Sequence, residues 1–140
     1  MYVSKIFLTV DNVVIRKVDH EIEILLIKRL KDPFKDFWAL PGGFVDENED
    51  LDVAARRELF EETNVKVDEV LQIGAYGKPF RDPRSHVVSI AFFSETDKNT
   101  IAKAADDAKD VSWFKIKHLP PTAFDHSEII ADAISKFKLL

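Results

Sequence analysis

The sequence predicts an α/β fold with mixed strand directions. Three observations support this prediction. Apolar, β-branched runs of strand length occur on both sides of one amphipathic helical stretch between Asp50 and Asn64. A second helical stretch, from His126 to about Phe137, closes the chain behind them. The 140 residues suffice for one core, so we expect residues 1–140 to form a single domain.

Composition excludes several classes of protein. The chain has no cysteine, so disulfides and thiolate metal sites are impossible, and a reducing cytoplasm fits. The N-terminal stretch lacks the features of a signal peptide, and no apolar run reaches the roughly 20 residues of a membrane span. We therefore expect a soluble, cytoplasmic protein without a membrane partner.

The net charge of −5 is concentrated in one stretch. Eight acidic and two basic residues lie between Asp46 and Glu62, so this stretch carries −6 and the rest of the chain about +1. No basic stripe resembles a nucleic-acid surface, so we expect no nucleic-acid partner.

Three strands are predicted before the acidic stretch. Ser4–Val10 is one, and Asn12–Arg16 pairs with Ile22–Lys28 in a hairpin closed around residues 18–20. Ile22–Lys28 is apolar at nearly every position, which indicates burial on both faces. Lys28 and Arg29 at its end are either solvated or steer a phosphate.

A charged loop with aromatic residues follows, from Lys31 to Trp38. Its aromatic side chains could cover a ligand or close the edge of the core, and we favour the core for Trp38. Ala39 and Leu40 then form a short strand that leads into the turn Pro41-Gly42-Gly43.

The helix after this turn has two different faces. Asp50 is a suitable N-cap, and Leu51, Ala55 and Leu59 recur every four residues, so this face packs on the sheet. The carboxylates on the other face belong to Glu58, Glu61 and Glu62.

Residues three and four apart on a helix are neighbours, so these three carboxylates lie together. They raise one another's pKa unless a cation lies among them, and Mg²⁺ or Mn²⁺ prefers such oxygen ligands. A solvated acidic surface is the alternative for this helix face taken alone.

The stretch from Leu40 to Val65 resembles the signature of the Nudix hydrolases. That signature is a glycine, five residues, a glutamate, seven residues, then Arg-Glu-aliphatic-any-Glu-Glu-any-Gly-aliphatic. The matching positions are Gly43, Glu49, Arg57, Glu58, Leu59, Glu61, Glu62 and Val65. At the late glycine the chain has Asn64, which we expect to end the helix in a left-handed conformation, where asparagine is the usual second choice.

The resemblance covers nearly all of the chain. It implies the Nudix-type α/β/α sandwich with a mixed β-sheet, and hydrolysis of a nucleoside diphosphate linked to another moiety. It also implies one or more Mg²⁺ (or Mn²⁺) ions. The implied ligands are Glu58, Glu61, Glu62 and a backbone carbonyl of Gly42 or Gly43, which we assign to Gly43. Glu49 is expected to orient or supplement this set.

A pyrophosphate ester is kinetically inert because its negative charges repel a nucleophile, and bound Mg²⁺ both neutralises charge and activates water. We assign catalytic roles to Glu58, Glu61 and Arg57, since Arg57 can orient Glu61 at i+4. Related enzymes take the general base from this helix or from a later loop. Glu58 is favoured here, but Asp106 and Asp107 on the later segment remain candidates.

Two further strands, Val70–Tyr76 and His86–Phe93, are joined by the loop Gly77–Ser85. This loop carries three cations and one acid in the sequence GKPFRDPRS. It is either a solvated turn or a diphosphate-binding loop, because arginine binds phosphate with two hydrogen bonds. It looks like the Arg-Asp-Pro-Arg loop of Nudix proteins related to ADP-ribose pyrophosphatases. We therefore assign substrate binding to Lys78, Arg81, Arg84 and Arg29.

The C-terminal part completes the fold. Glu95–Lys109 is polar and expected to be partly mobile, and Val111–Ile116 is a strand. Asp125 and Glu128 form a predicted capping box at the start of the last helix. The segment AFDHSEII around this helix start resembles the same subgroup.

The favoured function is hydrolysis of ADP-ribose to AMP and ribose 5-phosphate, with a small nucleotide diphosphate as the only predicted substrate class. A catalytically silent effector-sensing domain related to transcription regulators is the alternative, and a plain binding module is weaker. The base and sugar of the substrate, the number of metal ions and the oligomeric state stay open, and a homodimer is one possibility.

Overall fold

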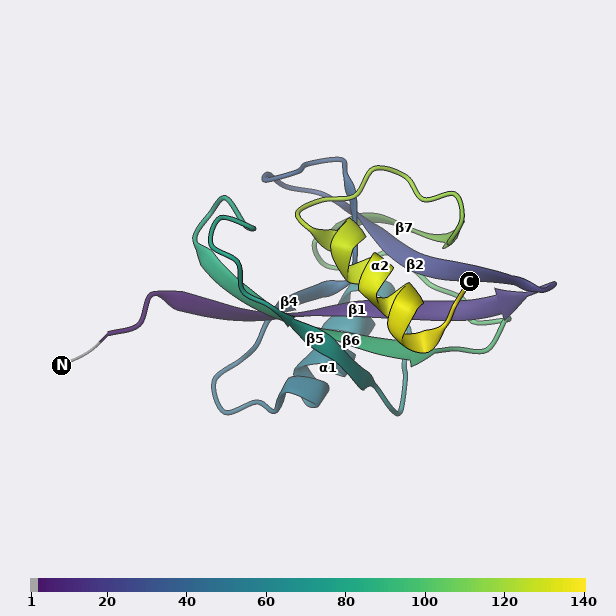
Figure 1. Cartoon of the computed structure of the whole chain (residues 1–140), viewed down its shortest axis with the longest axis horizontal. Coiled ribbons are helices and arrows are strands. Elements are labelled where there is room, and N and C mark those ends of the chain that lie inside the picture. Colours follow the sequence, from purple (N-terminus) through teal and green to yellow (C-terminus); the bar gives the residue numbers. More distant parts are fainter. Residues whose placement is uncertain (1–2) are drawn as a thin grey trace.

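The computed structural model describes residues 3–140 as a mixed seven-stranded sheet with two helices (Figure 1). The elements are β1 Ile6–Val18, β2 Glu21–Arg29, β3 Trp38–Ala39, β4 Gly42–Phe44, α1 Leu51–Thr63, β5 Leu71–Tyr76, β6 His86–Glu95, β7 Ala108–Lys115 and α2 His126–Phe137. The α/β prediction is confirmed.

The sheet has the order β3-β2-β1-β6-β5, with β4 added to β1 and β7 added to β2. Strands β1 and β6 run parallel, and the other pairs are antiparallel. The mixed sheet that the sequence predicts is therefore present, with its one parallel pair at the centre.

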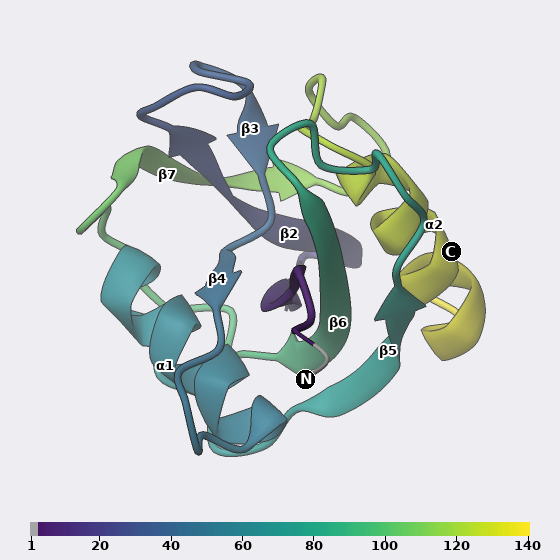
Figure 2. The same cartoon turned by 90° about the vertical axis from the view of Figure 1, so that its left-hand side faces the viewer.

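Alternating side chains along β1 cover both faces of the sheet. Val13 and Ile15 belong to the apolar cluster that includes residues of α2, whereas Val10 and Val14 pack in clusters with residues of α1. Figure 2 shows the two helices on opposite sides of the sheet. Both faces are buried, which explains the continuous apolar runs at residues 13–15 of β1 and 24–27 of β2.

Two strand predictions differ from the structure. From Ile6 onward, the two predicted strands Ser4–Val10 and Asn12–Arg16 belong to the single strand β1, because β6 pairs with it continuously past Asp11. The predicted turn at Gly42 is instead part of β4, which pairs with β1. A side chain at Gly42 would clash with the carbonyl oxygen of Val10, so this pairing requires glycine there.

The ends of the helices test the capping predictions. Asp50 caps α1 by accepting a hydrogen bond from the amide of Leu51, and Asn64 ends it with φ 60°. Both predictions are confirmed. The capping box of α2 is wrong, because the Asp125 side chain makes no cap bond and instead accepts hydrogen bonds from Arg81.

Trp38 packs against the main core and edge-on against Phe114, so the core interpretation of this aromatic residue is confirmed. Among residues 3–140, neither helix is long and apolar enough to cross a membrane.

Candidate active site

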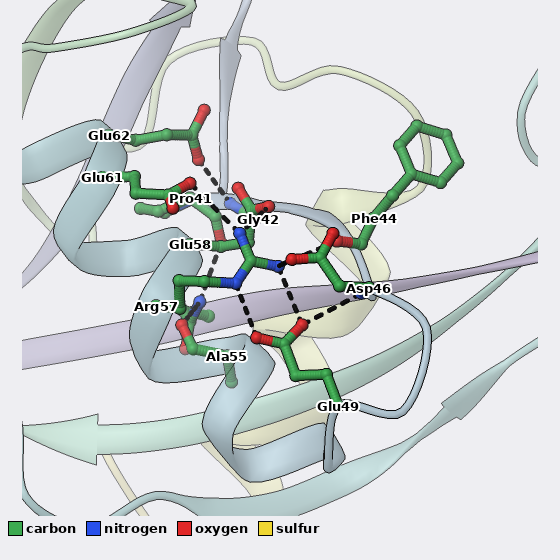
Figure 3. A network of polar contacts seen from close by, with 11 residues as sticks. Pro41, Gly42, Phe44, Asp46, Glu49, Ala55, Arg57, Glu58, Glu61 and Glu62 are labelled. Carbon is green, nitrogen blue, oxygen red and sulfur yellow. Dashed lines mark hydrogen bonds and ion pairs between the residues drawn. The ribbon is translucent and has the colours of Figure 1, made fainter.

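Arg57 organises the acidic face of α1 (Figure 3). Its guanidinium donates two hydrogen bonds to Glu49, of 2.6 and 2.9 Å, and one each to Glu58 at 2.9 Å and Glu61 at 3.1 Å. It also donates to the carbonyl of Phe44. The expected Arg57–Glu61 pair is present, and Glu49 orients Arg57. The pKa of Glu49 falls to about 2, chiefly through the hydrogen bonds from Arg57.

Strand β4 lies directly against these carboxylates. The amide of Gly42 donates to Oε1 of Glu62 at 2.7 Å. At Gly43 an added Cβ would meet the Glu58 carboxylate, so glycine leaves the room this side chain occupies. Glycine is therefore required at both positions, because the backbone of Val10 approaches Gly42 and the carboxylate of Glu58 approaches Gly43.

Asn12 joins helix α1, which carries the acids, to the segment that leads into β4. Its backbone amide donates to the carbonyl of Pro41 at 2.8 Å. Its side-chain nitrogen donates to Pro41 at 3.2 Å and to the carbonyl of Ala55 in α1 at 3.0 Å. Sequence reasoning missed this buried residue, because an asparagine within an apolar strand carries no motif.

A cavity of about 420 Å³ opens beside these residues. Its lining includes the acids Asp46, Glu58, Glu61, Glu62, Asp106 and Asp107 and the cations Arg29, Lys31, Arg81 and Arg84. Phe44 and Phe124 also line it. A cavity lined by both acids and cations suits a ligand that carries both metal ions and phosphates.

Burial shapes the electrostatics of the acids that line the cavity. Burial raises the pKa of Glu62 to about 8, opposed by the Gly42 amide and reinforced by Glu58, Asp11 and Asp107. Burial also raises the pKa of Glu58, against the effect of Arg57. Such carboxylates favour protons or a cation, so the donor chemistry fits a divalent ion. Across residues 3–140, however, no three acidic or histidine side chains already converge as metal ligands.

The predicted phosphate-binding cations differ in their surroundings. Arg81 is almost fully buried and forms two hydrogen bonds with Asp125, of 2.5 and 2.8 Å. Arg84 is 43% exposed and is held by Asp82 at 2.7 Å. The guanidinium of Arg29 lies 5.0 Å from the Phe124 ring centroid. These three arginines line the cavity, whereas Lys78 does not.

A buried polar cluster lies under the cavity and was missed by the sequence analysis. Ser89 donates to the carboxylate of Asp11 at 2.5 Å, and Nε2 of His126 lies 3.6 Å from the other oxygen of Asp11. Burial raises the pKa of Asp11 and lowers that of His126. The segment AFDHSEII contains His126, but nothing in the local pattern indicated that it would meet Asp11.

A mixed sheet between two helices, with an acidic helix face against a glycine-containing strand, defines a Nudix-type domain. The NUDIX domain family model matches residues 7–133, and the chain belongs to this family.

Two curated relatives resemble the chain over most of its length. An ADP-ribose pyrophosphatase of Methanocaldococcus jannaschii is 44% identical over 115 residues, which are 82% of this chain and 68% of that protein. The ADPR responsive transcriptional repressor NtrR of Acinetobacter baylyi is 29% identical over 133 residues. That match covers 92% of this chain and 53% of the repressor, so the chain spans about half of its length.

Solved structures agree with the fold. A MutT/nudix family protein from Enterococcus faecalis matches with a TM-score of 0.91 and 32% identity, over 99% of this chain and 64% of that one. The NUDIX domain of Shewanella oneidensis NrtR complexed with ADP ribose matches with a TM-score of 0.88 and 29% identity, over 96% of this chain and 90% of that one.

Proposed function

We propose that this chain is a Nudix pyrophosphohydrolase domain that converts ADP-ribose to AMP and ribose 5-phosphate with Mg²⁺ or Mn²⁺. The observation that carries the proposal is the cavity itself, because acids of α1 and three arginine side chains line the same space of about 420 Å³. The pyrophosphatase from Methanocaldococcus jannaschii supports the substrate class. The ADP-ribose complex of the Shewanella NUDIX domain supports the ligand.

The residues that would hold the cation are Glu58, Glu61, Glu62 and the carbonyl of Gly43. A bound divalent ion supplies neutralisation of the diphosphate charge and activation of water. Glu58 and Glu61 accept hydrogen bonds from Arg57 in the structure. When they bind a cation, they would replace part of these hydrogen bonds by bonds to the metal. Arg57 then keeps its two bonds to Glu49, which hold it beside the site.

Glu58 is our choice for the general base. Burial raises its pKa, which makes its carboxylate a stronger proton acceptor. Asp106 and Asp107 also line the cavity, so they remain the competing bases. Loss of turnover in Asp107→Asn, with turnover kept in Glu58→Gln, would reverse the assignment.

Arg29 and Arg84 are proposed to contact the diphosphate. Each lines the cavity, and Arg84 keeps an exposed guanidinium. Charge-assisted bonds from arginine to phosphate are among the stronger polar contacts in proteins. Lys78 is left without a role in this proposal because it lies outside the cavity lining.

A second candidate is an effector-sensing domain that binds ADP-ribose without hydrolysing it. The similarity to the Acinetobacter repressor favours it. Against it, this chain keeps the full set of acids on α1 together with Arg57. Both candidates bind the same ligand, so only turnover separates them.

The deciding experiment measures hydrolysis of ADP-ribose, NADH, a dinucleoside polyphosphate and a nucleoside triphosphate with Mg²⁺, with products identified by chromatography. AMP and ribose 5-phosphate from ADP-ribose, at the highest kcat/KM of the panel, are expected. Tight ADP-ribose binding without product would favour the sensor. A preference for the triphosphate would contradict the assigned substrate.

A further inference from the structure

We infer that His126 is a positioning residue for the cation site, because it holds the chain segment that connects β3 to β4. The inference rests on the cation site proposed above and assigns a function to a histidine on the opposite side of the sheet from α1. Of the four histidines of the chain, His126 is the one that lines the cavity.

The connection between β3 and β4 leaves a gap in backbone pairing. Strand β3 pairs with β2, with Ala39 opposite Ile27, and β4 pairs with β1, with Gly42 opposite Asp11. Leu40 and Pro41 between them belong to neither ladder, as the two short arrows in Figure 2 illustrate. The amide of Leu40, a residue only 2% exposed, therefore needs another acceptor.

His126 supplies this acceptor. Its Nδ1 accepts the hydrogen bond from the Leu40 amide at 3.0 Å. Nδ1 must then be unprotonated, so the ring proton of the neutral imidazole lies on Nε2, which faces Asp11. Burial lowers the pKa of His126, which keeps the ring in this neutral form.

The hydrogen bond from Leu40 to His126 affects the acids of α1 through the consecutive residues Leu40, Pro41 and Gly42. Leu40 is held by His126, the Pro41 carbonyl by Asn12, and the Gly42 amide by Glu62. Without the imidazole, a buried amide is left without an acceptor, and the segment shifts to reach water or another partner. Such a shift moves the Gly42 amide away from the position that fixes the Glu62 carboxylate.

Two substitutions separate this role from simple packing. His126→Phe keeps a ring but removes the acceptor, whereas His126→Asn keeps an oxygen close to the position of Nδ1. Without nucleotide, the Mn²⁺ dissociation constant from electron paramagnetic resonance should rise about tenfold in His126→Phe, as for one lost hydrogen bond. It should stay close to the wild-type value in His126→Asn.

Tyr76→Phe is the matched control, because it removes a 2.6 Å hydrogen bond to Asp132 on α2 away from the cavity. It should leave Mn²⁺ binding unchanged. Equal Mn²⁺ affinity in wild type and His126→Phe overturns the inference, even if the melting temperature of the variant falls.

A measurement on the wild-type protein covers the case in which His126→Phe does not fold. Titration of Mg²⁺ into ¹⁵N-labelled protein should shift the His126 Nδ1 resonance and the Leu40 amide with the same midpoint as the Gly42 amide. An unchanged His126 resonance contradicts the positioning role. Absence of ADP-ribose hydrolysis would contradict only the proposed substrate, since neither metal experiment contains a nucleotide.

Discussion

Glu62 is the side chain on which the proposed chemistry depends most directly. It is 8% exposed and bound to the Gly42 amide, so its second oxygen is the one left for a cation. Glu62→Gln should lower kcat for ADP-ribose by several powers of ten at saturating Mg²⁺, because a neutral amide is a weaker ligand. Steady-state kinetics and circular dichroism check this together. Near wild-type turnover in a folded variant would show that Glu62 is not a ligand.

The lowered pKa of Glu49 makes the folding stability of the protein depend on pH. Its pKa of about 2 in the folded protein lies below the ordinary value of 4.5, so pairing with Arg57 favours the ionised form. Its contribution to stability is therefore present above pH 4.5 and is lost as the pH falls toward 2. Glu49→Gln should be less stable than wild type at pH 7, with a difference that shrinks as the pH falls through this window.

Urea unfolding at pH 7, 4 and 3 measures this difference. Glu47→Gln is the control, because Glu47 is an exposed acid of the same loop. It should change stability little at each pH. A Glu49→Gln difference that stays constant from pH 7 to 3 would contradict the role of the ion pair with Arg57.

At the scale of the element, Asn64 tests how α1 ends. Its φ of 60° and its hydrogen bond to the carbonyl of Phe60 are those of a left-handed cap. Asn64→Gly should be close to neutral in stability and activity, whereas Asn64→Val should cost about 1 to 2 kcal/mol in the free energy of unfolding. Chemical unfolding measures both. If Asn64→Gly lost activity at unchanged stability, the amide side chain would have a role in the site.

The loop between β5 and β6 contains two arginines with different expected roles. Arg84→Ala should raise KM for ADP-ribose about tenfold, as for one lost charge-assisted contact. It should also lower the melting temperature, because the buried Asp82 carboxylate loses its guanidinium partner. Arg81→Ala should lower the stability by about 3 to 5 kcal/mol with little change in KM, because it leaves the Asp125 carboxylate without its partner.

Kinetics and thermal melting of both variants decide between these roles. The sequence alone predicts that both arginines contact phosphate. A large change in KM with an unchanged melting temperature in Arg81→Ala would restore that interpretation.

At the scale of the whole molecule, the acids of the cavity reduce the stability of the metal-free protein. Burial raises the pKa of Glu62 and Glu58, so their ionised forms are unfavourable without a cation. Mg²⁺ binds the folded state and should raise the melting temperature of wild type in proportion to log concentration well above its dissociation constant. In Glu62→Gln this increase should be much smaller. Calorimetry at fixed pH with Mg²⁺ or EDTA measures it, and an equal increase in both proteins would place the cation elsewhere.

Much of the site could be predicted because it is local in sequence. The spacing of Glu58, Glu61 and Glu62 on one helix determines their common face, and Arg57 reaches Glu61 within one turn. The same holds for the cap at Asn64. Apolar runs predict most of the strands, but the boundaries of several strands differ from the prediction at both ends, and β4 is absent from it, because strand ends depend on pairing partners distant in sequence.

Residues a few positions apart therefore suffice to predict the family, the helices and the acidic helix face. The contacts between residues far apart in the chain depend on the tertiary fold. Arg81 meets Asp125 across 44 positions, and Leu40 meets His126 across 86. Local periodicity carries no information about such pairs, because they depend on how β1, β6 and α2 are brought together around the cavity.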